Sequence, residues 1–175
     1  MMMMMMMMMN LTRSNYLHSI IEFYLAITFT FSCATACSSC LSNAAMRWDV
    51  PESILEAIIL QESGWDPDVC NINNNGSQDS GLMQINSVNI NLLKSAGIIS
   101  DERLLMQPCT NIEAGAYLLS LKFKKYGYTW RAVGAYHSET AHHGKKYADN
   151  IMKIVHTKKN FFRQKDLISP VPQQE

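Results

Sequence analysis

Apolar residues recur at helical spacing through most of the chain after residue 50. The segment Pro51–Gly64 is one example, since Pro51 suits the first position of a helix and Gly64 suits its end. The same spacing predicts a helical stretch that residues 81–85 lead into and that runs through residue 95. It predicts further helices over residues 101–106, 110–126, 129–137 and 145–156. Thr110 and Glu113 have the spacing of a capping box, which predicts where the long central helix starts.

Strand-type alternation is weak throughout the chain. The loop Trp65–Ser80 is dense in asparagine and other turn formers, so it has room for a short hairpin and little more. A chain of 175 residues is long enough for one domain with a sizeable core, and nothing in it repeats or divides it. We therefore expect a single compact all-α domain with at most a small hairpin after its first helix.

The N-terminal region has the features of a secretory signal. An arginine, Arg13, precedes the short apolar segment 20–31, and the small residues Ala34-Thr35-Ala36 follow it. We expect cleavage after Ala36 and a periplasmic or secreted product. An uncleaved anchor is the alternative, although the segment is brief and polar for a membrane span. Lipidation at Cys37 is a further, weaker alternative.

Three parts are therefore expected along the chain. Residues 1–36 hold the signal, opened by the run Met1–Met9, which has no pattern that could pack. Residues 37–156 form the folded domain. Residues 157–175 are basic and then polar, and we expect them to be a disordered tail.

Charge bears on the kind of partner. The formal net charge is zero, which gives no support for nucleic-acid binding. The distribution is uneven: residues 48–93 contain seven acidic residues and no lysine or arginine, whereas basic residues dominate 103–165. These are either two ordinary solvated faces or a locally acidic site. We expect a monomer.

The cysteines indicate disulfides, not a metal. Signal cleavage would leave Cys37, Cys40, Cys70 and Cys109, an even number that allows three connectivities in an oxidising compartment. We favour Cys40 with Cys109, which leaves Cys70 free or paired with Cys37. No Cys-x-x-Cys pair recurs and the histidines are far away, so we expect neither a metal nor an organic cofactor.

Glu62 is the strongest candidate for chemistry. Stepping back by fours from it reaches Ile58 and Ile54, so its carboxylate shares the apolar face of its own helix. A carboxyl held against apolar neighbours has a raised pKa and can donate a proton near neutral pH, as glycosidic cleavage requires. The alternative is a carboxylate that ends a helix and points into water.

Three separated motifs strengthen the first interpretation: Glu62-Ser63, Gly81-Leu-Met-Gln-Ile-Asn86 and Ala135-Tyr-His137. In this order they resemble the catalytic domain of the soluble lytic transglycosylases, a lysozyme-like family that cleaves peptidoglycan. The similarity covers about residues 40–155. It is greatest to the small branch that accompanies type III and type IV secretion and conjugation systems.

The resemblance implies a role for Glu62 as the single catalytic acid/base. It would protonate the oxygen between N-acetylmuramic acid and N-acetylglucosamine, then take the proton of the muramoyl C6 hydroxyl as a 1,6-anhydro ring closes. It also implies a cleft that binds sugar through Ser63, Gly81, Met83, Gln84, Tyr136 and His137. Tyr136 would bring its hydroxyl to Glu62 or to the acetamido group. Met83 and Tyr136 can also be read as core residues, and Ser63 as a helix end.

Two departures from the family pattern concern the site. The third motif usually ends in asparagine, where this chain has His137, and Glu139 stands where glycine is frequent. Asp79, just before Gly81, either assists Glu62 across the cleft or forms an ordinary turn.

Three function classes remain. The first is a lytic transglycosylase that opens the wall for a secretion or conjugation apparatus. Its close variant is a hydrolytic muramidase that uses Glu62 with Asp79. The others are a non-catalytic peptidoglycan-binding assembly factor and a secreted interaction protein with chance motifs.

Overall fold

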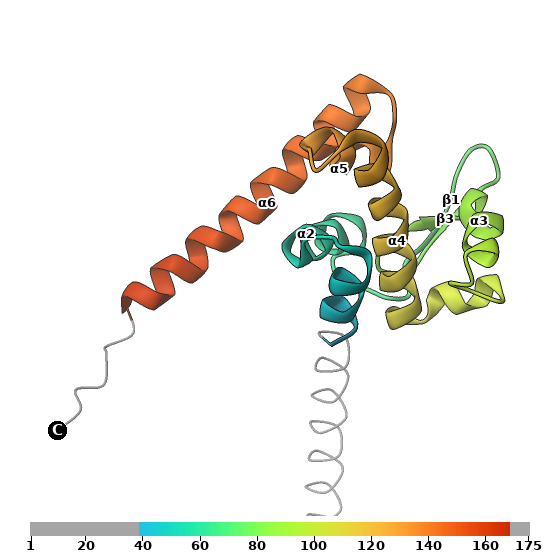
Figure 1. The fold of residues 1–175 in the computed structure, drawn as a ribbon, viewed down its shortest axis with the longest axis horizontal. Coiled ribbons are helices and arrows are strands. Elements are labelled where there is room, and N and C mark those ends of the chain that lie inside the picture. The colour runs from blue at the N-terminus through green and yellow to red at the C-terminus, as the bar shows by residue number, and fades with distance from the viewer. Residues whose placement is uncertain (1–38, 169–175) are drawn as a thin grey trace, which may run out of the picture. The chain divides into compact units, whose positions relative to one another are not determined.

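The computed structural model describes residues 39–168, with side chains through Lys158 (Figure 1). A helical segment over 39–48 comes first. The elements that follow are α2 (Glu52–Ser63), β1 (Cys70–Ile72), β2 (Gln78–Ser80), β3 (Ile85–Asn86), the 3-10 helix η1 (Ser87–Asn89), α3 (Ile90–Ser95), the 3-10 helix η2 (Glu102–Met106), α4 (Pro108–Tyr126), α5 (Trp130–His137) and α6 (Ala141–Ile168). The mainly helical fold is confirmed. The proposed signal and Cys37 lie outside the described residues.

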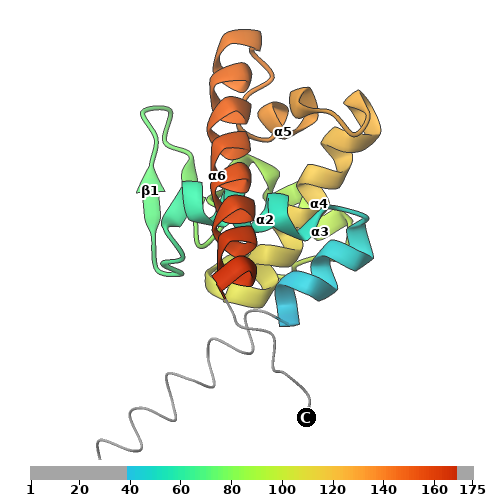
Figure 2. The same cartoon turned by 90° about the vertical axis from the view of Figure 1, so that its left-hand side faces the viewer.

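Helix α4 runs through the middle of the domain, with α2 on one side and the small sheet on the other (Figure 1). Helix α6 packs against α5 and crosses α2 (Figure 2). The core lies where these helices meet, and Ile58, Ile59, Leu119 and Ile151 are wholly buried in it. Burying such side chains contributes about 1.5–3 kcal/mol each.

Helix α2 brings the candidate acid to the edge of the core. Its apolar face is buried as the spacing predicts, and it ends at Gly64, whose φ of 62° is the left-handed conformation that glycine adopts without strain. The amide of Gly64 donates to the carbonyl of Leu60, which closes the last turn. Glu62 therefore stands in the final turn of a well-anchored helix.

The sheet is larger than the predicted hairpin. Strands β1 and β2 pair antiparallel, and β3 adds to β2 with Asp79 opposite Asn86. Residues 81–85, predicted to lead into a helical stretch that runs through residue 95, form a turn and the start of β3, and η1 and α3 follow. Gly81 and Gln84 both have positive φ, 69° and 47°, which a helix does not allow.

Other helix ends also differ from the predictions. The segment 39–48 was not predicted as helix. Helix α4 starts at Pro108, not at Thr110, and Glu113 accepts hydrogen bonds from Trp48 and Arg47 in place of capping the helix. Helix α6 begins at Ala141 and continues through Ile168, so the part of the tail that it includes is helical.

A disulfide joins Cys40 to Cys109, which confirms the favoured pairing. It ties the segment 39–48 to the first turn of α4 across a sequence separation of 69 residues. In the chain-entropy description, closing a loop of that length stabilises the folded state by about 4 kcal/mol. Cys70 is exposed and has no disulfide partner within the described part of the chain.

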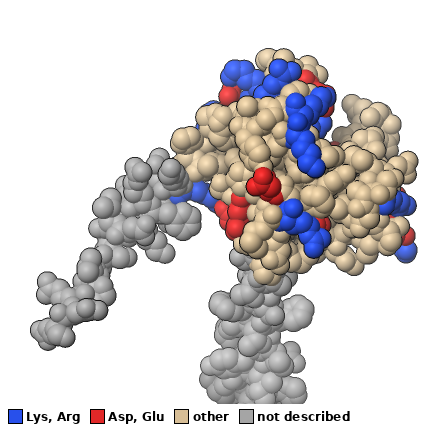
Figure 3. Space-filling view, viewed as in Figure 1, with Lys and Arg blue, Asp and Glu red and all other residues tan. Residues whose placement is uncertain are grey.

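Charged side chains of both signs are interspersed on the face shown in Figure 3. Ion pairs of the domain include Lys122–Glu139 and Lys145–Asp149, both with N–O distances of 2.7 Å. Mixed charge of this kind favours solubility over the binding of a polyanion.

Asn111 is the polar centre of the core. It is wholly buried on α4, and its side chain accepts from the amide of Met83 at 2.7 Å. Its amide group donates to the carbonyls of Ser80 and Leu105, each at 2.7 Å. A Cβ on Gly81 would lie 2.5 Å from the Asn111 amide nitrogen, so only glycine fits there. One side chain thus holds the second motif against α4.

We predict that Asn111→Ala lowers the free energy of unfolding by about 3 kcal/mol, because it leaves one buried backbone amide and two carbonyls without partners. Asn91→Ala, at an exposed position on α3, serves as the matched control and should cost less than about 0.5 kcal/mol. Urea unfolding of both variants measures the difference. A cost below about 1 kcal/mol for Asn111→Ala would contradict this role.

Candidate active site

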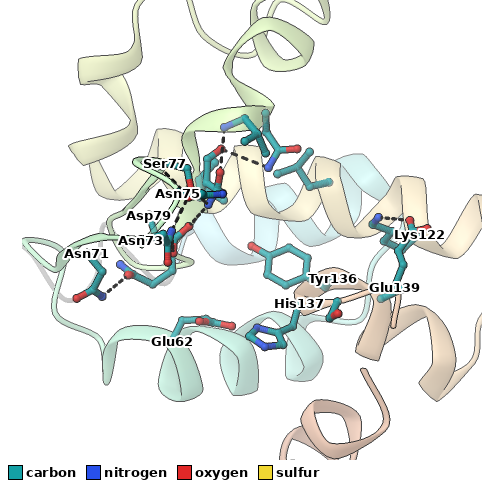
Figure 4. A pocket seen from close by; sticks show the side chains of 18 of the residues that line it. Glu62, Asn71, Asn73, Asn75, Ser77, Asp79, Lys122, Tyr136, His137 and Glu139 are labelled. Atoms are coloured by element: carbon teal, nitrogen blue, oxygen red, sulfur yellow. Dashed lines mark hydrogen bonds and ion pairs between the residues drawn. The ribbon is translucent and has the colours of Figure 1, made fainter. Parts of the chain in front are cut away.

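A cavity of about 890 Å³ opens between the end of α2, the small sheet, α4 and α5 (Figure 4). Glu62 stands on one wall, Asp79 and the asparagine-rich β1–β2 hairpin on another, and Tyr136 and His137 on the α5 side. Polar side chains predominate along the hairpin, including Asn71, Asn73, Asn74, Asn75 and Ser77. A cleft of this size with amide-rich walls suits a polar polymer such as a glycan.

Glu62 is half-buried, and its pKa lies above the usual value for a glutamate. Burial is the main cause, because it disfavours the charged form, and the nearby charge of Asp79 raises the pKa further. A hydrogen bond opposes both effects: the hydroxyl of Tyr147 donates to Glu62 Oε1 at 2.6 Å. The carboxyl is therefore biased toward its protonated form and aligned by one donor.

The hydroxyl that reaches Glu62 belongs to Tyr147. Tyr136 was predicted to bring its hydroxyl to Glu62 or to the acetamido group of the substrate, and the first of these alternatives is wrong. Tyr147 is 6% exposed on α6. Tyr136 instead donates to the carbonyl of Met83 at 2.9 Å. Burial is the main cause of a raised pKa for both tyrosines, so both remain neutral donors.

Asp79 is not part of an isolated turn. It lies on β2, and its two carboxylate oxygens accept from the amide groups of Asn73 at 2.8 Å and Asn86 at 2.7 Å. Asn86 comes from the neighbouring strand, so the sheet itself orients the carboxylate toward the cavity that Glu62 lines. Two donors stabilise its charge.

The second motif is mostly structural in this chain. Met83 is wholly buried and does not line the cavity, so the predicted apolar contact with sugar is wrong. Its side chain packs on Gly115 of α4. Gly81 is buried against Asn111 and is likewise no cavity wall. The side chain of Gln84 does line the cavity, but it donates to the carbonyls of Gly81 and Val69.

Ser63 connects the first and second motifs. Its hydroxyl lies 2.9 Å from the carbonyl of Leu82 and 3.2 Å from that of Ile59 in its own helix. This geometry allows Ser63 to orient the end of α2 against the second motif. It does not require the Ser63 hydroxyl to contact sugar. Glu139 binds Lys122 and Lys125 at 2.7 Å each, and these lysines hold its pKa low, at about 2.

His137 lines the cavity at the end of α5 and is exposed. Its ring stacks on that of Tyr147, with centroids 4.8 Å apart and planes 4° from parallel.

Sequence reasoning missed Tyr147 and Asn111 as site residues. A buried tyrosine and a buried asparagine on apolar helix faces were the available signals, since each needs a polar partner.

No group of three or more acidic, histidine or cysteine side chains in residues 39–168 is arranged to hold a metal ion. Over the same residues, no helix combines the length and apolar character that crossing a bilayer requires.

Comparison with known proteins identifies the family. Residues 39–154 match the family described as "Transglycosylase SLT domain". "Invasion protein IagB" of Salmonella typhimurium is 40% identical over 119 residues, which cover 68% of this chain and 74% of that protein. "Protein IpgF" of Shigella flexneri is 39% identical over 120 residues, covering 66% and 78%.

Solved structures agree on the fold. The 70 kDa soluble lytic transglycosylase SLT70 from Escherichia coli matches with a TM-score of 0.60 at 22% identity, over 71% of this chain. Lytic transglycosylase Slt from Pseudomonas aeruginosa matches with a TM-score of 0.58 at 20% identity, over 77% of this chain. The chain spans about a quarter of the length of these two proteins, 24% and 25% respectively.

The chain therefore belongs to the transglycosylase SLT domain family, and the resemblance seen in its three motifs is confirmed. Its class of enzyme is that of the lytic transglycosylases, which degrade peptidoglycan.

The raised pKa of Glu62 has a consequence for stability. Below the ordinary glutamate pKa both the folded and the unfolded protein carry this proton. As pH rises above that value, the unfolded chain loses the proton first, so the folded state is progressively destabilised until its own Glu62 ionises. Each unit of raised pKa corresponds to about 1.4 kcal/mol.

We predict that Glu62→Gln is more stable than the wild type at pH 7 and that this advantage shrinks as pH falls toward 4. The glutamine keeps an oxygen that can accept from Tyr147 and has no proton to lose. Denaturant unfolding at a series of pH values tests this. An advantage that stays constant from pH 4 to pH 8 would show that the pKa of Glu62 is not raised.

Proposed function

We propose that this protein cleaves the β-1,4 bond between N-acetylmuramic acid and N-acetylglucosamine and leaves a 1,6-anhydro muramoyl end. One observation carries the proposal: a single half-buried carboxyl, biased toward its protonated form and aligned by Tyr147, faces a cavity large enough for a glycan. Family membership supplies the class of reaction, and this geometry supplies the proton donor.

In the first step Glu62 gives its proton to the oxygen that joins the two sugars. The bond between this oxygen and the muramoyl C1 breaks, the bonding electrons leave with the oxygen, and C1 becomes electron-poor. The acetamido oxygen of the substrate stabilises C1. Glu62 is now a carboxylate, and the hydroxyl of Tyr147, 2.6 Å away, stabilises its new charge.

In the second step Glu62 takes the proton of the muramoyl C6 hydroxyl, and the C6 oxygen bonds to C1. No water is consumed and Glu62 returns to its protonated form, so one carboxyl serves as acid and then as base. The raised pKa suits both roles, because a group whose pKa is near the working pH exchanges its proton readily in either direction.

Asp79 acts in this scheme as a fixed negative charge. Its two oxygens are held by Asn73 and Asn86, which restrains it from swinging onto C1 as a nucleophile. From its position it favours the protonated form of Glu62 and steadies the cationic centre. Because Asp79 lines the same cavity, a hydrolytic muramidase that uses both carboxylates is the second candidate.

The remaining binding roles are proposed for the cavity walls. Gln84 lines the cavity and can reach a sugar, whereas Ser63 orients α2 against the second motif. We place the enzyme in the periplasm or outside the cell after cleavage near Ala36, with residues 37–156 as the working domain. We propose that it works as a monomer on glycan strands.

The cellular setting is drawn from the relatives. One is named an invasion protein, and about three quarters of its length is shared with this chain. This supports a role in opening the wall locally for a secretion or conjugation apparatus, whose components would be partners.

Mass spectrometry of the muropeptides released from purified peptidoglycan tests the reaction. The wild type should release anhydro-ended products, and Glu62→Gln should lower the rate at least about 100-fold through loss of the proton donor. Glu52→Gln, on the exposed first turn of the same helix, is the matched control and should retain full activity. Free reducing ends from the wild type would favour the muramidase, and activity in Glu62→Gln would refute the assignment.

A further inference from the structure

Three helices meet in a short chain of contacts at the catalytic carboxyl. Glu62 comes from α2, Tyr147 from α6 and His137 from the end of α5. The hydroxyl of Tyr147 donates to Glu62, and the ring of Tyr147 stacks on the ring of His137. The two rings are 4° from parallel.

The position of the Tyr147 hydroxyl depends on the tilt of its ring. Rotation about χ2 leaves the hydroxyl oxygen in place, because this oxygen lies on the rotation axis. A change in χ1 swings the whole ring about the Cα–Cβ bond, and it moves the terminal oxygen the most because that atom is farthest from the backbone. The flat imidazole of His137 lies against one face of this ring at a centroid distance of 4.8 Å and opposes such a tilt. The hydrogen bond of 2.6 Å requires a fixed hydroxyl.

We propose that His137 is a positioning residue, whose ring holds the hydroxyl of Tyr147 against Glu62 through the aromatic stack. The inference rests on the proposed function, since it concerns how the acid of that reaction is aligned. It gives His137 a role through its flat ring, in place of the sugar hydrogen bond that its motif position suggests.

Several titratable or charged groups face this chain of contacts. Asp79 on β2 and Tyr136 on α5 lie around Glu62, and the Lys122–Glu139 pair lines the same cavity on the side of α4 and α5. Asp79 raises the pKa of Glu62, whereas Tyr147 lowers it. Of these groups, Tyr147 alone stacks on the imidazole ring of His137, so the Tyr147 hydroxyl transmits the effect of His137.

The sign of the pH effect follows from the direction of the Tyr147 contribution. When the hydroxyl loses its place, the carboxylate form of Glu62 is less stabilised and the pKa of Glu62 rises further. The protonated form then persists to higher pH, so the alkaline limb of the activity profile moves upward. A weaker acid also donates its proton more slowly, which lowers kcat.

Two substitutions separate the stack from hydrogen bonding. His137→Phe keeps a flat ring and removes both nitrogens, and His137→Asn removes the ring and keeps a hydrogen-bonding group. We expect His137→Asn to lower kcat about fivefold, within the range that an aromatic pair contributes, with little change in KM. We expect His137→Phe to retain kcat within about twofold and to keep the wild-type pH profile.

A double-mutant cycle with Tyr147→Phe identifies the route of the effect. Once the hydroxyl is gone there is nothing left for His137 to place, so His137→Asn should have no further effect on kcat in that background. His142→Asn is the matched control. His142 is exposed at the start of α6, contacts only the edge of His143 among the described aromatic rings, and does not line the cavity.

The inference is overturned if His137→Asn retains full kcat, if its effect is undiminished in the Tyr147→Phe background, or if His137→Phe is as impaired as His137→Asn. A rise in KM without a change in kcat would also overturn it and assign His137 to sugar binding. Wild-type activity measured in the same assay distinguishes a failure of the proposed function from a failure of the positioning role of His137. An inactive wild type refutes the proposed function, whereas an active wild type with additive variants refutes only the positioning role.

Discussion

The site depends on the burial of one carboxyl at the last turn of α2. Water near Glu62 is displaced by the surrounding core, and this loss of solvation outweighs the hydrogen bond from Tyr147 that favours the charged form. The fold around it provides two opposing influences, a negative charge at Asp79 and a neutral donor at Tyr147. Together they place the carboxyl where it can release a proton and later accept one.

The rest of the domain serves to hold that arrangement rigid. Asn111 on α4 accepts from the amide of Met83 in the second motif and donates to the carbonyls of Ser80 and Leu105, and Ser63 attaches the same motif to α2. The sheet orients Asp79 because Asn86 lies opposite it in the register. Residues 81–83 of the second motif therefore join neighbouring elements, whereas residues 84–86 line the cavity together with the β1–β2 hairpin.

Much of the fold could be predicted from local pattern. The apolar spacing of α2 and the end signal at Gly64 led to the right helix and to Glu62, and the disulfide Cys40–Cys109 was paired correctly. The start of α4 was not predicted, because Glu113 accepts a hydrogen bond from Trp48, which depends on tertiary contacts. The strand at Ile85 was not predicted, because the positive φ of Gln84 also depends on tertiary contacts. The motif gave Tyr136 as a partner of Glu62 or of the acetamido group, whereas Tyr147 on α6, distant in sequence, makes the contact with Glu62.

The most direct test of this account is the pKa of Glu62 itself. Titration of the wild-type protein labelled with ¹³C at glutamate side chains, with Glu62→Gln used to assign the resonance, measures the pKa of this carboxyl. We expect a value clearly above the ordinary range for glutamate in the free enzyme. A Glu62 that titrates at or below that range would contradict the central claim that burial keeps the proton donor loaded.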